Sequence, residues 1–146
     1  TSVGAKTLTA TYAGDANFNG STSATAPHTV NKADTTTTVT SSKNPIWQGE
    51  DVTFTANVAV PAPGTGTPTG SITFKDGGVD IVGCIGVALS GLQATCTTAF
   101  PVAGTHNITA VYSGDASFNS STGALAQVVN AATWLGSRPI SSIRTV

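Results

Sequence analysis

The sequence predicts an all-β fold, an antiparallel β-sandwich of about seven strands, from three observations. Hydrophobic residues make up 39% of the 146 residues and charged residues only 9%, and Thr, Ser, Gly, Ala, Asn and Val fill the difference. Threonine and valine are β-branched and fit pleated surfaces, and no stretch has a long 3.6-residue periodicity. Strand-like segments recur between residues 34 and 130 with a turn signal roughly every 8 to 15 residues, which is typical of a two-sheet sandwich.

One segment of the sequence occurs twice. Residues 4–21 read GAKTLTATYAGDANFNGS and residues 104–121 read GTHNITAVYSGDASFNSS, and the two align without a gap at an offset of 100 residues. Self-similarity at a fixed period indicates a tandem repeat. The most telling identities are Tyr12 and Tyr112, Gly14 and Gly114, Asp15 and Asp115, Phe18 and Phe118, and Asn19 and Asn119.

This repeat divides the chain into three parts. Residues 1–33 hold two strand signals and are expected to be the last strand pair of a preceding repeat. Residues 34–130 are expected to form one complete sandwich. Residues 131–146 follow no repeat motif and are either a natural C-terminal extension or an added tail. The side chains of the first strand that alternate onto one apolar face are Leu8, Ala10 and Tyr12.

Within the complete unit, period-2 alternation predicts which side chains face the core. The clearest strand is residues 51–60, and the Pro/Gly loop at residues 61–70 that follows it contains too many breakers to be a strand. Its expected inward residues are Val52, Phe54, Ala56, Val58 and Val60. In the repeated segment the expected inward residues are Ile108, Ala110 and Tyr112.

The two cysteines are expected to form a disulfide. Residues 79–89 and 92–100 are predicted to pair as a hairpin about Ser90, and Cys84 and Cys96 lie six residues on either side of that serine. A symmetric hairpin places them opposite each other, at a distance compatible with a disulfide. Closing a loop of this size stabilises a fold by about 3 kcal/mol in the chain-entropy model. The alternative is a pair of buried free thiols; a metal or catalytic role is disfavoured because no histidine or third cysteine accompanies them.

Several strings in the complete unit resemble the bacterial immunoglobulin-like repeat family. They are T-T-T-T-V-T, V-T-F-T-A, P-T-G-S-I-T-F, A-G-T-H-N-I-T-A-V-Y-S-G-D-A-S-F and a terminal V-N. The resemblance covers residues 34–130 fully and residues 1–33 as the tail of a previous repeat. It implies an immunoglobulin-like sandwich that occurs in tandem in large secreted or surface proteins, often adhesins, with no catalytic residues to carry over. It also supports pairing Cys84 with Cys96.

Catalytic and metal-binding chemistry has few candidates. A Ser–His–Asp hydrolase needs a histidine base beside a nucleophile, and only His28 and His106 could serve, with no G-x-S-x-G elbow present. Solvated positions near strand ends are the favoured interpretation of both; His106 is the better candidate because it belongs to the complete repeat. Asp15 and Asp115 could suggest calcium, but a lone aspartate in a turn more often bonds its own backbone. We therefore predict no catalytic residue, no metal and no cofactor.

These features predict a structural spacer and interaction module of an extracellular or bacterial cell-surface repeat protein, related to adhesion and without catalysis. One alternative is self-assembly, in which residues 1–33 add as strands to another copy. The other is a small hydrolase or a carbohydrate-binding module on the same fold, for which the spare aromatics Trp47 and Trp134 could form a sugar platform.

The partners that remain are neighbouring repeats, other copies of the chain, or an extracellular glycan or protein ligand. The net charge of −1 argues against nucleic acid, whose binding needs clustered Lys or Arg. No run approaches the 18 apolar residues or so of a membrane-spanning helix.

Overall fold

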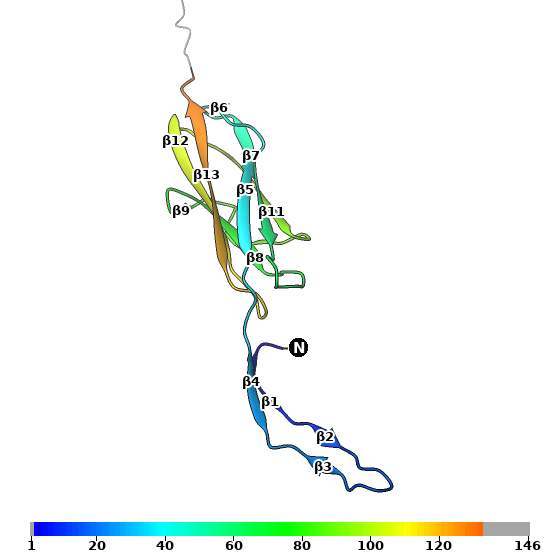
Figure 1. Cartoon of the computed structure of the whole chain (residues 1–146). Helices are drawn as coiled ribbons and strands as arrows, with labels where there is room; N and C mark the ends of the chain where they lie inside the picture. The colour runs from blue at the N-terminus through cyan, green and yellow to red at the C-terminus, as the bar shows by residue number, and fades with distance from the viewer. Residues whose placement is uncertain (1, 133–146) are drawn as a thin grey trace, which may run out of the picture.

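The computed structural model describes residues 2–132, which contain thirteen strands and no helix. They form a sandwich and a separate pair of long strand segments that projects from one end of it (Figure 1). We call this projecting pair the N-terminal hairpin. Its strands are β1 (Gly4–Leu8), β2 (Thr11–Tyr12), β3 (Ser21–Thr22) and β4 (Ala26–Val30).

The sandwich consists of two sheets. One is antiparallel in the order β11–β7–β5; the other has the order β10–β8–β12–β13–β6, with β9 paired to β8 and β6 parallel to β13. An immunoglobulin-like sandwich has this two-sheet arrangement. The strands are β5 (Thr36–Ser41), β6 (Ile46–Trp47), β7 (Asp51–Ala59), β8 (Ser71–Asp76), β9 (Val79–Asp80), β10 (Val87–Ala88), β11 (Gln93–Ala99), β12 (Gly104–Tyr112) and β13 (Ser121–Asn130).

The core lies between these sheets and belongs to the sandwich alone. Strand β7 turns alternate side chains inward, and the other sheet meets them with side chains from β8 and β12. In the described part of the chain no residue before Thr37 is buried. The expected inward faces are confirmed, with exposure of 1% or less at Val52, Phe54, Ala56, Val58, Ile108, Ala110 and Tyr112, whereas Val60 is only partly buried at the edge of the core.

The two sheets approach each other most closely where β13 crosses β5. A Cβ added at Gly123 would lie 2.5 Å from the carbonyl oxygen of Thr37, so only glycine permits this approach. Nearby, Gln127 is fully buried, and its side-chain oxygen accepts a hydrogen bond from the hydroxyl of Ser41 at 2.7 Å. This edge of the sandwich is therefore closed by polar contacts.

The predicted hairpin of residues 79–89 with 92–100 forms only at its turn, where Ser90 pairs with Gln93 as an isolated antiparallel bridge. Strand β11 pairs with β7 in one sheet, while β9 and β10 pair with β8 in the other. The segment between β9 and β10 contains Gly83 and Gly86, both with positive φ, which prevents it from continuing as an extended strand. Strand β11 instead buries alternate residues against the core beside β7.

The predicted disulfide is present, although it does not lie across a hairpin. Cys84 and Cys96 are bonded with a Cα–Cα distance of 5.5 Å. The carbonyl of Cys84 accepts a hydrogen bond from the N–H of Phe74 in β8, and Cys96 lies in β11. The bond therefore joins the two sheets.

The N-terminal hairpin repeats the pairing of β12 with β13 but contains a bulge. Gly4 pairs with Val30 as Gly104 pairs with Val129. Between the paired segments, residues 9–10 on one side face residues 23–25 on the other, and one extra residue opposite a shorter segment is a β-bulge. The single strand predicted through Leu8, Ala10 and Tyr12 is therefore split. Residues 133–146, most of the predicted tail, lie outside the described residues.

We expect loss of the disulfide to destabilise the sandwich markedly. Replacing both Cys84 and Cys96 by alanine removes a cross-link over a sequence separation of 12, and should lower the free energy of unfolding by about 3 kcal/mol. Thermal unfolding followed by circular dichroism would show a melting temperature lower by roughly 12 to 24 °C. Wild-type protein melted with a reductant is the control and should behave like the double variant. A difference of under about 1 kcal/mol would contradict the cross-link as a main source of stability.

Candidate functional site

The features that could carry function lie at the two ends of the sandwich. The entry end comprises the linker 32–35 and the loops 61–70 and 113–120. The exit end comprises residues 46–50, 100–104 and 130–132. Figure 1 shows the chain entering the sandwich at one end and leaving it at the other.

At the entry end, main-chain hydrogen bonds hold the linker against the loop between β12 and β13. The N–H of Ala33 donates to the carbonyl of Ser117 at 2.9 Å, and the N–H of Asn119 donates to the carbonyl of Ala33 at 2.8 Å. Ala33 thereby pairs with Phe118 as an isolated parallel bridge. We call this arrangement the linker clasp.

Side chains on both sides of Ala33 extend the clasp. The amide of Asn119 donates to the carboxylate of Asp34 at 2.8 Å, and the hydroxyl of Thr35 donates to the carbonyl of Asn119 at 2.8 Å. On the other side the ammonium group of Lys32 donates to the carbonyl of Asp115. Four consecutive linker residues are therefore bonded to one loop.

Asp115 shapes that loop. One carboxylate oxygen accepts the N–H groups of Ser117 (2.7 Å) and Phe118 (2.9 Å), and the other accepts the N–H and the hydroxyl of Thr69, both at 2.8 Å. Desolvation raises the pKa of Asp115, but these donors lower it more, to about 2. The expected turn-stabilising role of Asp115 is confirmed, and Phe118, 5% exposed, closes this end of the core.

The N-terminal hairpin carries the same turn without a core beside it. Asp15 accepts the N–H groups of Asn17 (2.8 Å) and Phe18 (3.0 Å), as Asp115 does in its own turn. Its other carboxylate oxygen accepts the hydroxyl of Tyr12 at 2.7 Å. Phe18 is 68% exposed and Tyr12 is 46% exposed, whereas their counterparts in the sandwich are buried.

Two open cavities flank the linker at the entry end. One, of about 300 Å³, is lined by residues 32–34 and 61–64. The other, of about 340 Å³, is lined by Val3, Val30, Asn31 and Ala33 together with residues 65–66 and 117–118. The first includes Pro61 and Pro63 and no residue before Lys32.

At the exit end, Gln48 holds the departing chain. Its N–H donates to the carbonyl of Asn130 and its side-chain oxygen accepts the N–H of Ala132, both at 3.0 Å. Its amide nitrogen donates to the carbonyl of Pro101 at 3.0 Å. The sequence shows Gln48 only as part of a turn, so this role was missed.

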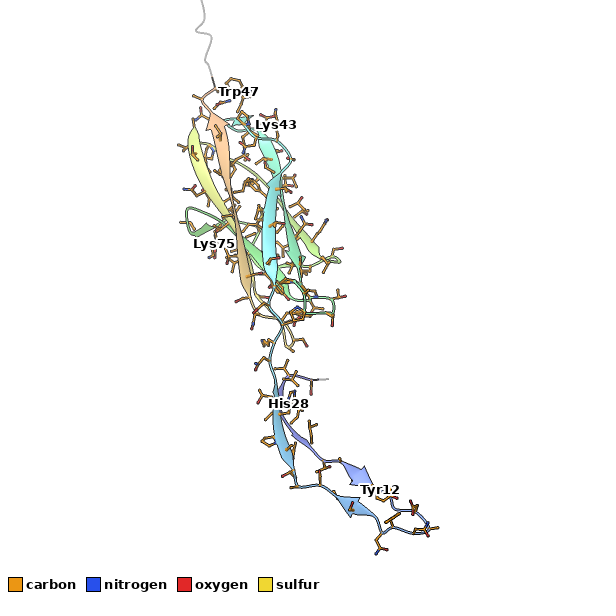
Figure 2. All side chains as sticks on the ribbon, in the orientation of Figure 1. Tyr12, His28, Lys43, Trp47 and Lys75 are labelled. Carbon is orange, nitrogen blue, oxygen red and sulfur yellow. A yellow bond between two sulfur atoms is a disulfide. The ribbon has the colours of Figure 1, made fainter. Side chains whose placement is uncertain are left out.

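Trp47 lies beside this contact. It pairs with Asn130 in the parallel β6–β13 ladder, and its backbone N–H donates to the carboxylate of Glu50 at 2.9 Å. Its side chain is 51% exposed and lies at the end of the sandwich from which the chain leaves (Figure 2). Glycan binding by Trp47 stays a prediction.

His106 is not a solvated edge histidine as predicted, because it lies in the central strand β12 with its side chain 16% exposed. Nδ1 lies 2.6 Å from the carboxylate of Asp76, Nε2 lies 3.0 Å from the carbonyl of Val102, and the ring centroid lies 4.3 Å from that of Phe100. Desolvation lowers the pKa of His106, but the two hydrogen bonds and the charge of Asp76 outweigh it and raise the pKa above its ordinary range. Both ring nitrogens face acceptors, so the arrangement favours the imidazolium form.

The remaining predicted site residues are dispersed. Leu8 and Tyr12 are about half exposed on the hairpin, and Ala10 falls in its bulge. None of the three packs on the sandwich, while docking on another chain stays a prediction. His28 is exposed on β4 (Figure 2). Within residues 2–132 no three metal-ligating side chains gather, and no helix could cross a membrane.

Comparison with known proteins identifies the family. The model for the bacterial Ig-like domain (group 3) matches residues 38–130. The chain belongs to this bacterial Ig-like domain family. A comparison with curated proteins finds no match. Among solved structures the Ig-like chain is similar to the crystal structure of BslA, a bacterial hydrophobin, at 13% sequence identity, over 70% of this chain and 98% of that one, with a TM-score of 0.29.

We expect Asp115→Ala to destabilise the Ig-like sandwich. The equivalent change in the hairpin, Asp15→Ala, should not. Hydrogen bonds to a charged group contribute about 1.5–3 kcal/mol, so the free energy of unfolding in urea should fall by that amount. Asp15→Ala is the matched control and should leave the free energy of unfolding unchanged, because the hairpin adds nothing to the core.

The contribution of Asp115 should also depend on pH. Since its folded pKa lies below the unfolded value, the stability it provides is present above about pH 4 and is lost as the pH falls through about 2. Equal effects of the Asp115 and Asp15 changes would contradict the role assigned to this turn.

We expect the stability of the sandwich to fall as His106 loses its proton. Its folded pKa is raised, so its stabilising contribution is complete below the unfolded value of about 6.5 and is lost as the pH rises through the folded value. Urea unfolding at a series of pH values would show this decline in wild type and its absence in His106→Gln. His28→Gln is the control and should keep the wild-type profile; an unchanged profile in His106→Gln would rule out this assignment.

Proposed function

We propose that this chain is a structural spacer module of a bacterial secreted or cell-surface repeat protein related to adhesion, without catalysis of its own. The observation that carries the proposal is the linker clasp. A linker that is bonded through four consecutive residues to the following sandwich cannot rotate freely, so successive repeats keep a defined direction. A stack of such units extends a distant domain with each added repeat.

The composition of the chain agrees with this role. With charged residues at 9% and a net charge of −1, the module offers little to attract charged ligands or polymers. The core is enclosed between two sheets and cross-linked by a disulfide, which suits an oxidising extracellular environment.

Self-assembly is the second candidate function. The N-terminal hairpin is a two-stranded sheet with an unpaired edge on each side, and it exposes Leu8, Tyr12 and Phe18. Unpaired edges invite strand addition by another chain. A partner copy that covered these side chains would turn the hairpin into a donated element.

The experiment is a length series. Chains with one, two and three copies of residues 34–130, joined through the natural linker, should be monomeric by light scattering. Their maximum dimension by small-angle X-ray scattering should grow by about 35–40 Å per copy, the length of a ten-residue strand plus two linker residues.

Failure of this proposal would be easy to recognise. If the copies folded back on one another, the maximum dimension would not grow regularly with the number of copies. Oligomers of the full chain that disappear when residues 1–31 are removed would favour self-assembly.

A further inference from the structure

We infer that the entry end of this sandwich is a docking surface for the exit end of a preceding Ig-like repeat, and that the residue at the position of Trp47 in that repeat packs into the cavity formed by residues 32–34 and 61–64. This inference rests on the proposed tandem arrangement. It adds to that arrangement the partner surface, which is the exit end of the preceding repeat, and the side chain that makes the contact.

The register of the hairpin locates the preceding repeat. Because Gly4 pairs with Val30 as Gly104 pairs with Val129, β4 corresponds to β13, and Asn31 corresponds to Asn130. In the complete sandwich Asn130 pairs with Trp47. A preceding repeat with the same topology therefore places its equivalent of Trp47 directly beside Asn31.

The linker is too short to keep the two ends apart. Val30 ends β4, and Ala33 is already bonded to the loop of the next sandwich. Three residue steps span at most about 11 Å. The exit end of the preceding repeat must therefore lie against the entry end of this one.

The strand order favours one side of the linker for the indole. Strand β13 lies between β12 and β6, so the equivalent of β6 lies on the side of β4 opposite β1. The cavity that includes Val3, the residue before β1, is on the β1 side. Asn31 also lines that cavity. The other cavity includes no residue before Lys32, and we assign the indole to it because β6 lies on the side away from β1.

The chemistry of that cavity suits an aromatic ring. Its loop presents Pro61, Ala62 and Pro63, all exposed, and a rigid apolar surface costs little conformational entropy to cover. The aliphatic part of Lys32 lines its rim, while the ammonium group of that residue stays bonded to the carbonyl of Asp115. On the partner side, Trp47 is 51% exposed and offers one of the largest apolar surfaces of any side chain.

The test is a two-repeat chain in which residues 34–130 are joined directly to residues 32–132, so that Asn130 of the first copy takes the place of Asn31. Each copy then contains one tryptophan, because Trp134 is left out, and each keeps a complete core. In a chain with Trp47→Phe in the second copy, tryptophan fluorescence comes only from the first indole. In a chain with Trp47→Phe in the first copy, it comes only from the second. We expect the first indole to emit at shorter wavelength and to be quenched by acrylamide at least twofold less than the second.

The cavity formed by residues 32–34 and 61–64 is tested with a matched pair of variants. Ala62→Glu in the second copy should remove the protection of the first indole and increase proteolytic cleavage in the linker. The same substitution in the first copy faces no partner and should change neither. Circular dichroism confirms that all variants are folded.

Two results would overturn the inference: equal quenching of the two indoles, or equal effects of Ala62→Glu in both copies. Either can occur while the length still grows regularly with copy number, which leaves the spacer function intact. Collapse of the length series would instead count against the spacer function itself.

Discussion

The carboxylate of Asp115 is the contact on which the entry end of the sandwich depends. It fixes the turn between β12 and β13 through the N–H groups of Ser117 and Phe118, and it joins that turn to Thr69 just before β8. In this conformation the backbone groups of the loop bond to both the N–H and the carbonyl of Ala33. One turn at the surface thus controls the packing of two strands and the direction of the incoming chain.

A comparison of the N-terminal hairpin with β12 and β13 distinguishes the structure that the turn sequence forms by itself from the structure that depends on packing against the core. Asp15 makes the same two backbone hydrogen bonds as its counterpart, so the turn forms without any sheet packed on it. Tyr12 donates to Asp15, whereas Tyr112 donates to the carbonyl of Thr69 and makes only a longer contact, of 3.4 Å, with Asp115. The hairpin has no segment in the place of the one that precedes β8. The hairpin also contains a bulge that is absent from the packed strands. Local sequence determines the turn, and burial keeps the strand regular.

The sequence predicted local features well and nonlocal pairings poorly. Period-2 alternation identified the buried faces of β7 and β12, and the cysteine pair was correct. The partner of β11 was wrong, because it is chosen by burial of Ala94 and Cys96 beside β7 rather than by proximity along the chain. The clasp on Ala33 had no sequence signal, since main-chain hydrogen bonds require no particular side chain. The environment of His106 depends on Asp76, thirty residues away, which periodicity cannot indicate.

In the proposed tandem arrangement, the two ends of the sandwich would compete for a single donor, the N–H at the position of Ala132. By the register of the repeat Ala132 corresponds to Ala33, yet Ala132 donates to Gln48 of its own sandwich while Ala33 donates to Ser117 of the following one. One N–H cannot make two strong hydrogen bonds in different directions. Docking of a following repeat would therefore exchange the glutamine acceptor for a loop carbonyl, at little net cost in hydrogen bonding. The stiffness of the joint must then come from the remaining clasp contacts and from apolar packing, which is what an exposed indole at one end and a proline loop at the other can provide.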